Sequence, residues 1–497
     1  MTRRTASPEL QALLSIDRRR RAPLYRQIYD GLRSAILEGL LRPGQRLPST
    51  RVLALDIGAS RLPVLSAYDQ LLHEGYLVGR VGSGTFVSSA MPDETLRAGA
   101  SSARARPGRP SRQKARALPP ERDEGGLRPF RTSLPALDEF PHGIWARLVA
   151  RRARSLTPAQ MAYGDPAGTG ALRLAIAEHV RTWRAVSCEA EQVLIVSGSQ
   201  AALRLCATVL LGNGDAVAIE EPGYPGAHAA LGATGAELIP IELDADGMDV
   251  TALENESASR ARRGGASLRA AYLTPSHQYP LGAPMSAPRR LDILDWSKRR
   301  DAWLIEDDYD SEYRYVSQPL AALQGMGAQE RVIYIGTFSK VLFPALRIGY
   351  VVVPPTLWEE FVAAREALDI FSPTLYQLAL ADFMNEGHFV RHIRRMRGVY
   401  LRRRAALLAG IARHCSGLLV VHNADAGLHV ATILPARVDD VKVVMRLGAH
   451  GLTATPLSTC YIGPNRRTGL LLGFGGFSES QITNATQTLG KVLRASV

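Results

Sequence analysis

Seven short apolar runs alternate with segments of helical periodicity through the second half of the chain. They cover residues 193–196, 216–219, 238–241, 270–273, 303–305, 332–335 and 348–353. Such alternation restricts a chain to an α/β domain with a largely parallel sheet, and ligands of such sheets bind at the carboxyl ends of the strands. The loops that follow these runs are therefore where a functional site should be sought.

A lysine stands in the loop after the sixth run. Lys340 follows the turn Gly336-Thr337-Phe338-Ser339, and Arg347 comes seven residues later. Because an ammonium group is costly to bury, such a lysine indicates either a buried ion pair or an amine kept for chemistry. A solvated lysine at a strand end is the alternative, and Lys340 by itself does not decide between these.

Three other loops offer groups that a ligand could use. Ser199 and Gln200 follow a Ser-Gly turn at a helix start, where free amides suit a phosphate, although a serine cap alone would be structural. Tyr224 stands in a tight turn, as a stacking platform or as a packed loop residue. Gln278 places an amide in a polar turn.

Acidic residues gather in the loop after the fifth run. Asp307, Asp308 and Asp310 surround Tyr309, and metal chelation is the obvious explanation for so many carboxylates. However, no histidine or glycine occurs there at the spacing of a metal-binding loop. We therefore expect no metal site.

Positive charge is concentrated at the N-terminal end. The whole chain carries +13, of which residues 1–131 contribute +11 and residues 132–497 only +2. This asymmetry favours a polyanionic partner such as nucleic acid, although a solubilising or disordered tail gives the same count.

The basic N-terminal block predicts three helices and a hairpin. Apolar spacing indicates helices over 23–39, 51–57 and 61–73, with Ser49 and Ser60 as N-caps of the second and third. Two strand-like runs around Gly82-Ser83-Gly84 follow. Two short helices joined by a glycine-containing turn form a helix-turn-helix, and the hairpin would be its wing.

This block resembles the GntR-type winged helix-turn-helix. The resemblance is carried by Pro23-Leu24-Tyr25-x-Gln27-Ile28, Leu41-x-Pro43-Gly44-x-Arg46-Leu47-Pro48-Ser49-x-Arg51, Glu74-Gly75-Tyr76-Leu77 and Gly82-Ser83-Gly84-Thr85-Phe86. It implies that Arg51, Ser60 and Arg61 meet phosphates or base edges in the major groove of double-stranded DNA. Gly84 and Thr85 would touch the DNA from the wing. Ser49 would either contact the DNA, like Arg51, or serve only as a helix cap.

The start of the third helix departs from this family. Leu62 and Pro63 stand where a polar residue followed by threonine is expected. Proline is tolerated in a first helical turn, so the helix is preserved, but a hydroxyl expected to read bases is missing.

Residues 89–131 predict a flexible basic linker. Ala, Pro, Ser, Gly and Arg replace apolar clusters there, so the segment lacks the apolar surface needed to fold alone. A passive tether is the simpler interpretation, and its arginines would add salt-sensitive affinity for DNA.

The groups in the loops of residues 132–497 together resemble the site of fold-type I pyridoxal phosphate (PLP) enzymes of the aspartate aminotransferase class. By that resemblance Lys340 forms the Schiff base, Asp307 pairs with the ring nitrogen, and Tyr309 bonds the phenolic oxygen. Choosing Asp307 over Asp308 depends on its place two residues before the tyrosine. The remaining implied cofactor contacts are Tyr224 stacked on the ring, Gln278 near the phenolic oxygen, Ser199, Gln200, Thr337 and Arg347 at the phosphate, and Tyr163 at the phosphate of the partner subunit.

A GntR-type winged helix, a basic linker and an aminotransferase-like domain in this order resemble the MocR subfamily of bacterial transcription regulators. The implied organisation is a DNA-binding domain at 1–88, a linker at 89–131 and a PLP-binding effector domain at 132–497. The expected function is a homodimeric transcription regulator whose promoter binding is controlled by PLP, alone or joined to an amino compound. An active aminotransferase with an appended DNA-binding domain is the alternative.

The chain departs from the aminotransferases at the residues that recognise an amino acid. Aminotransferases hold the substrate carboxylate with an arginine at the start of a late strand, and here that strand opens with Gly469. If Gly469 takes that position, an amino-acid effector is less favoured than PLP itself. If the loop is shifted, Arg467 would serve. Leu281 also replaces an expected threonine.

Four scattered cysteines, without a C-x-x-C pair, predict reduced thiols rather than disulfides or a zinc site. No apolar stretch is long enough to span a bilayer and the N-terminal residues do not resemble a signal peptide, so the cytoplasm is the expected location.

Overall fold

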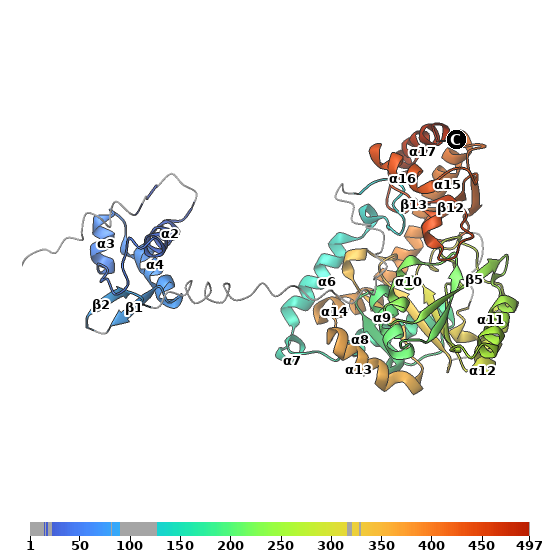
Figure 1. Ribbon diagram of the computed structural model, residues 1–497, viewed down its shortest axis with the longest axis horizontal. Helices are drawn as coiled ribbons and strands as arrows, with labels where there is room; N and C mark the ends of the chain where they lie inside the picture. Colours follow the sequence, from blue (N-terminus) through green and yellow to red (C-terminus); the bar gives the residue numbers. More distant parts are fainter. Residues whose placement is uncertain are drawn as a thin grey trace, which may run out of the picture. The chain divides into compact units, whose positions relative to one another are not determined.

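The computed structural model describes residues 14, 16–17, 22–80, 82–89, 127–315, 321–327 and 330–496. The chain divides into two compact units, Met1–Arg112 and Gln113–Val497, which are described separately (Figure 1). Of the predicted linker, residues 90–126 lie outside the described residues.

The described residues of the first unit form three helices and a hairpin, as predicted. They are α2 (Leu24–Leu37), α3 (Thr50–Asp56), α4 (Arg61–His73), β1 (Leu77–Arg80) and β2 (Gly84–Val87). One apolar face of each helix enters a shared core that includes Ile28, Leu32, Leu53, Val64 and Tyr68. The Ser49 hydroxyl accepts a hydrogen bond from the Val52 amide at 3.3 Å, which confirms its capping role.

The wing is an antiparallel pair with an additional partner. Leu77 lies opposite Val87 and Arg80 opposite Gly84. The segment before α3 also pairs with β2, because Leu47 N donates to Thr85 O and Val87 N donates to Gln45 O, both at 2.9 Å. These bonds join the wing to the helix-turn-helix.

The second unit is built on an eight-stranded mixed sheet in the order β3-β10-β9-β8-β7-β4-β5-β6. The strands are β3 (Val193–Val196), β4 (Ala216–Glu221), β5 (Glu237–Asp244), β6 (Gly247–Met248), β7 (Leu268–Leu273), β8 (Trp303–Asp308), β9 (Val332–Thr337) and β10 (Gly349–Val352). All seven predicted strands are present. The sheet is less uniformly parallel than predicted, since β10 runs antiparallel to both β3 and β9, and β6 antiparallel to β5.

Short connections explain the reversed strands. A parallel return needs a crossover of a dozen or more residues, usually a helix. Only residues 338–348 join β9 to β10, with a single 3-10 turn at Pro344–Leu346, and two residues join β5 to β6. The loop that carries Lys340 is therefore a tight return at the carboxyl end of β9.

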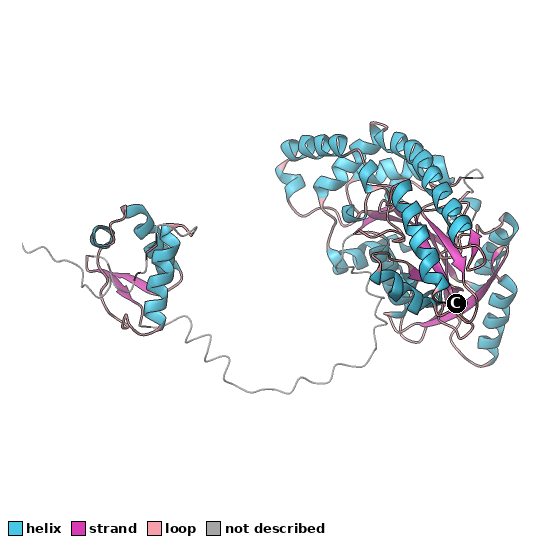
Figure 2. Ribbon diagram, turned by 90° about the horizontal axis from the view of Figure 1, so that it is seen from above, coloured by secondary structure: helices cyan, strands magenta, loops and turns pink. Residues whose placement is uncertain are grey.

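Helices cover both faces of this sheet (Figure 2). The helices between residues 142 and 385 are α6 (His142–Ser155), α7 (Pro158–Met161), α8 (Gly170–Arg184), α9 (Ser199–Leu210), α10 (Pro225–Gly232), α11 (Val250–Arg262), α12 (Ala287–Arg300), α13 (Trp358–Asp369) and α14 (Thr374–Asn385). Side chains alternate between the faces along each strand. In β8, Ile305 packs with the cluster that contains α9, and Leu304 with the cluster that contains α12.

A smaller antiparallel sheet, in the order β11-β12-β14-β13, completes the second unit. Its strands are β11 (Val420–Asn423), β12 (His429–Ile433), β13 (Thr455–Pro456) and β14 (Gly469–Gly473), and its helices are α15 (His388–His414), α16 (Asp440–Ala449) and α17 (Glu479–Arg494).

The four cysteines are buried and free. Within the described ranges, no helix is long and apolar enough to cross a membrane. In the same residues, no cluster of three or more His, Cys, Asp or Glu side chains could hold a metal ion.

Candidate functional site

The Lys340 side chain is half-buried, and its amine is bonded to the protein. Its Nζ donates a hydrogen bond to the backbone oxygen of Ser133 at 3.2 Å. Its neighbours Phe338, Val341 and Leu342 are buried, and they fix the turn after β9 against the core. Lys340 is therefore not a fully solvated lysine at a strand end.

Asp307 is the next-to-last residue of β8 and lies on the face that carries α9. Its Oδ2 accepts a hydrogen bond from the Tyr272 hydroxyl at 2.9 Å, whereas its buried Oδ1 has no partner among the described residues. Burial raises the pKa of Asp307 to about 7, although the Tyr272 bond and the nearby charge of Lys340 act in the opposite direction. One carboxylate oxygen is thus left available for a cationic or N–H donor.

Asp308 points to the opposite face, where its Oδ2 is engaged by an arginine and a tyrosine, while its buried Oδ1, like that of Asp307, has no hydrogen-bond partner among the described residues. Its Oδ2 accepts from Arg184 Nε and from the Tyr334 hydroxyl, each at 2.6 Å. Burial raises its pKa, but the Arg184 charge and these hydrogen bonds outweigh burial and hold the pKa below its ordinary value. Strand alternation therefore gives the two adjacent aspartates different environments.

Tyr309 belongs to a hydrogen-bonded group that the sequence did not reveal. Its hydroxyl lies 2.9 Å from His277 Nδ1, which lies 2.9 Å from Asp310 Oδ1. His277 and Asp310 are buried, and His277 stands 33 residues before Asp310. This group fixes the position of the Tyr309 hydroxyl.

Tyr224 and Gln200 meet across two loops. Gln200 Nε2 donates to the Tyr224 hydroxyl at 3.2 Å. A Cβ at Gly226 would lie 2.3 Å from Gln200 Nε2 and 2.5 Å from the Tyr224 ring, so only glycine fits there. The glycine sets the ring of Tyr224 close to the start of α9.

An arginine lies against the N-terminus of α9. A Cβ at Gly198 would come within 3.1 Å of Arg347 Nη1, and Gly198 has a φ of +90°. Ser199 opens α9, and the buried Thr337 accepts from Ser339 N at 3.2 Å. A guanidinium, hydroxyls and the free amides of a helix start suit a phosphate.

Gln278 has a different place from the one predicted. Its Nε2 donates to Tyr279 O at 2.6 Å, to Pro222 O at 2.9 Å and to Glu220 Oε2 at 3.3 Å, while its Oε1 accepts from Leu281 N. The side-chain amide is therefore used to shape its own turn. A contact with the phenolic oxygen stays a prediction that these bonds do not favour.

Neither position considered for a carboxylate clamp presents an inward arginine. Arg467 is exposed, and a Cβ at Gly469 would lie 2.0 Å from Thr432 O, which leaves no room for a side chain. Leu471, two residues further on β14, packs in a cluster with Tyr279, against which Tyr309 also lies.

Tyr163 does not join the other predicted residues within this chain. Its side chain is 84% exposed, and its ring centroid lies 6.2 Å from that of Phe371.

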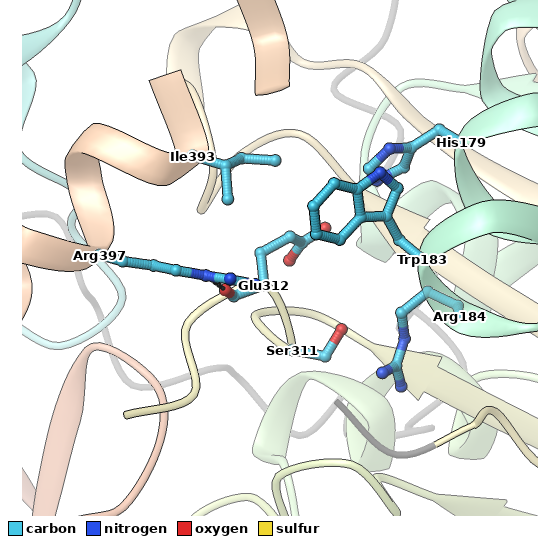
Figure 3. Close-up of a pocket in the computed structure, with 7 residues that line it drawn as sticks. All are labelled: His179, Trp183, Arg184, Ser311, Glu312, Ile393 and Arg397. Atoms are coloured by element: carbon cyan, nitrogen blue, oxygen red, sulfur yellow. Dashed lines mark hydrogen bonds between the residues drawn. The ribbon is translucent and has the colours of Figure 1, made fainter. Parts of the chain in front are cut away.

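A separate small cavity lies beside Arg184 (Figure 3). Its lining residues are His179, Trp183, Arg184, Ser311, Glu312, Ile393 and Arg397, and its volume is about 10 Å³. That volume suits one water molecule. Burial raises the pKa of Glu312 to about 7 and lowers that of His179 to about 4. None of the predicted site residues lines this cavity.

The predicted DNA contacts lie on the surface of the first unit. Arg51, Ser60, Arg61 and Gly84 are exposed and Thr85 is half-buried, and Arg61 Nε donates to Thr50 Oγ1 at 3.2 Å. Arg46 was missed by sequence reasoning. Its guanidinium lies against the wing, since a Cβ at Gly84 would be 3.1 Å from Arg46 Nε.

Comparisons with known proteins match both units. The family model of "Bacterial regulatory proteins, gntR family" matches residues 24–87, and that of "Aminotransferase class I and II" matches residues 142–485. The chain is 39% identical to the probable rhizopine catabolism regulatory protein MocR of Rhizobium meliloti, over 96% of this chain and 95% of that protein. The chain belongs to the MocR-type GntR regulators.

Other comparisons agree with this family. The regulator is 32% identical to the pyridoxine biosynthesis transcriptional regulator PdxR of Corynebacterium glutamicum, over 92% of this chain and 93% of that one. Its second unit resembles the kynurenine aminotransferase of Pyrococcus horikoshii, with a TM-score of 0.69 and 26% identity, over 74% of this chain and 91% of that chain. The MocR-type fold, its two kinds of domain and a role in transcription regulation are confirmed.

This family includes a domain whose fold binds PLP and a domain that binds DNA. In this MocR-type regulator, the contacts that the sequence did not indicate join segments that are distant in the chain. His277 directly precedes the predicted Gln278, but its contact with Tyr309 depends on how two loops meet.

Proposed function

We propose that this regulator binds PLP at Lys340 and that bound PLP, alone or joined to an amino compound, controls promoter binding. The observation that carries this proposal is the buried Asp307 Oδ1, which has no partner among the described residues and lies near the charge of Lys340. A protonated pyridine nitrogen would supply the missing donor and would keep Asp307 ionised.

The residues around Asp307 fit the other parts of PLP. When bound, PLP supplies an aldehyde that reacts with amines and a ring that withdraws electrons. Lys340 would provide the amine and Tyr309 would donate to the phenolic oxygen, held in place by His277. Tyr224 would cover the ring. The residues for the phosphate are Ser199, Gln200, Thr337 and Arg347.

PLP itself, or an amine without a carboxylate, is the effector that the site favours. Leu471 and Tyr279 make the surface next to Tyr309 apolar, and Gly469 has no space for an arginine. An apolar wall desolvates a carboxylate without compensating it. Arg467 would hold an amino acid only if its exposed side chain turned inward.

A homodimer is part of the proposal. The exposed ring of Tyr163 is available to reach the phosphate of a partner subunit. We retain the proposed limits of 1–88 for the DNA-binding domain, 89–131 for the linker and 132–497 for the effector domain. Because its target is chromosomal DNA, the regulator would act in the cytoplasm.

The proposal is tested by titrating the upstream intergenic DNA with the full chain, with and without PLP and with a panel of amines. PLP alone should change the DNA affinity by about 5- to 150-fold, the usual range of coupling between two sites. Equal affinities with and without PLP and every amine would contradict the proposal. Steady multiple-turnover formation of keto acid would instead favour the aminotransferase alternative.

Arg61→Ala should weaken binding to this DNA while leaving PLP binding unchanged. Arg61 is exposed in the first turn of α4, where a recognition helix meets base edges and phosphates. We expect a loss of about 5- to 150-fold, measured by fluorescence anisotropy.

Arg26→Ala is the matched control for charge, because Arg26 is an exposed arginine of α2 that pairs with Asp30. If both variants bound DNA like the wild type, Arg61 would have no part in recognition.

A further inference from the structure

One face of α4 points away from the core of the first unit. Val64, Ala67, Tyr68 and Leu71 are buried against that core. At 100° per residue, the opposite side of the helix carries Leu62, Ser66 and Asp69. Leu62 lies in the first turn, at the centre of the face that a recognition helix presents to DNA.

Leu62 is a large apolar side chain at a position that usually favours polar groups. It is 70% exposed, next to the exposed Arg61, and Ser66 one turn later is exposed too. Single exposed leucines are common and carry no meaning by themselves. The exposure of Leu62 is informative because the first turn of a recognition helix is the part that reaches the bases.

We propose that Leu62 reads a thymine in the operator through the C5-methyl group of that base. This inference rests on the proposed DNA-binding role of α4. A leucine side chain has no donor or acceptor, so it can read a base only by apolar contact. In the major groove thymine alone among the four bases presents a methyl group. Pro63 cannot donate from its backbone nitrogen either, which leaves no hydrogen bond from that amide.

The neighbouring groups fit this assignment. Arg61 and Arg51 are exposed basic side chains close to the start of α4, suited to phosphates or guanine. They would hold the helix in the groove while Leu62 reaches the base edge. Leu55 of α3 is 81% exposed, but the first helix of a helix-turn-helix crosses the DNA backbone instead of entering the groove. Leu55 is therefore a matched exposed leucine without the proposed role.

The test uses DNA fragments selected by the full chain from a random pool, in the presence of PLP. Each thymine of the selected site is replaced in turn by deoxyuridine, which removes only the methyl group. For the wild type we expect one such replacement to weaken binding about fourfold, the effect of losing one buried methyl group. Replacing the same T·A pair by 5-methylcytosine paired with guanine should be tolerated better than replacement by unmethylated cytosine paired with guanine.

Leu62→Ala should bind the thymine and deoxyuridine sites equally, whereas Leu55→Ala should keep the wild-type preference. Wild-type indifference to every deoxyuridine, or an unchanged preference in Leu62→Ala, would overturn the inference while leaving DNA binding intact. An altered oligomeric state of Leu62→Ala with unchanged methyl preference would assign Leu62 to a contact between subunits. If the wild type selected no DNA sequence, both this inference and the proposed function would fail.

Discussion

Lys340→Ala is expected to abolish the yellow colour that the wild type acquires with PLP. The Lys340 amine is held by Ser133 beside the buried Asp307, and no alanine can form the covalent link to the aldehyde. The measurement is the visible absorbance spectrum after incubation with PLP and dialysis. This variant should retain DNA binding but lose the change in DNA affinity that PLP causes.

Lys491→Ala is the matched control, because Lys491 is an exposed lysine near the end of α17. It should bind PLP with the wild-type spectrum. A colourless wild type, or a Lys340→Ala variant that still acquires the dialysis-resistant colour, would contradict the assignment.

Asp307→Asn is expected to lower the affinity for PLP, and Asp308→Asn is expected to lower the stability of the second unit. Asp307→Asn removes the carboxylate that would hold the pyridine nitrogen, so PLP affinity should fall about 10- to 100-fold, the value of a hydrogen bond to a charged group. Asp308→Asn leaves the buried Arg184 guanidinium without its counter-charge. Loss of one partner of a buried pair costs about 3–5 kcal/mol, so the unfolding midpoint of the second unit should fall.

Urea unfolding and PLP titration of both variants separate these effects. The roles of the two aspartates would be exchanged by the following result. Asp308→Asn would lose PLP affinity with an unchanged unfolding midpoint, and Asp307→Asn would bind PLP like the wild type.

The difference in stability between Asp307→Asn and the wild type should also depend on pH. Burial raises the pKa of Asp307 from 3.8 to about 7 in the folded protein without PLP. A raised carboxyl pKa means that stability is present at low pH and is lost as pH rises towards the folded pKa, because the unfolded chain deprotonates first. The asparagine of the variant cannot ionise. The advantage of the variant over the wild type should therefore grow from about pH 4 to pH 7 and then level off, as measured by urea unfolding across this range.

The sequence predicted the elements of the fold and the order of the two domains. Apolar periodicity located the strands of the large sheet, and caps such as Ser49 located helices, because both signals come from residues close together in the chain. The same local signals placed Lys340 in a loop after a buried strand. The family resemblance then suggested what that lysine does.

The tertiary structure decided which groups face the site. The Gln278 side chain bonds within its own loop, and Leu471 packs in the apolar cluster against which Tyr309 lies. The reversed direction of β10 also escaped prediction. Each outcome depends on contacts between segments that are distant in sequence.

The paired aspartates show the physical limit most clearly. Their sequence made Asp307 and Asp308 near equivalents, and only their order before Tyr309 distinguished them. In the folded sheet the pleat sends Asp308 to the Arg184 guanidinium, whereas Asp307 lies on the other face with only the Tyr272 hydroxyl bonded to it and the charge of Lys340 nearby. Local periodicity thus determined the strand and its carboxylates, while long-range packing decided which carboxylate is paired with an arginine and which is left without a cationic side chain bonded to it.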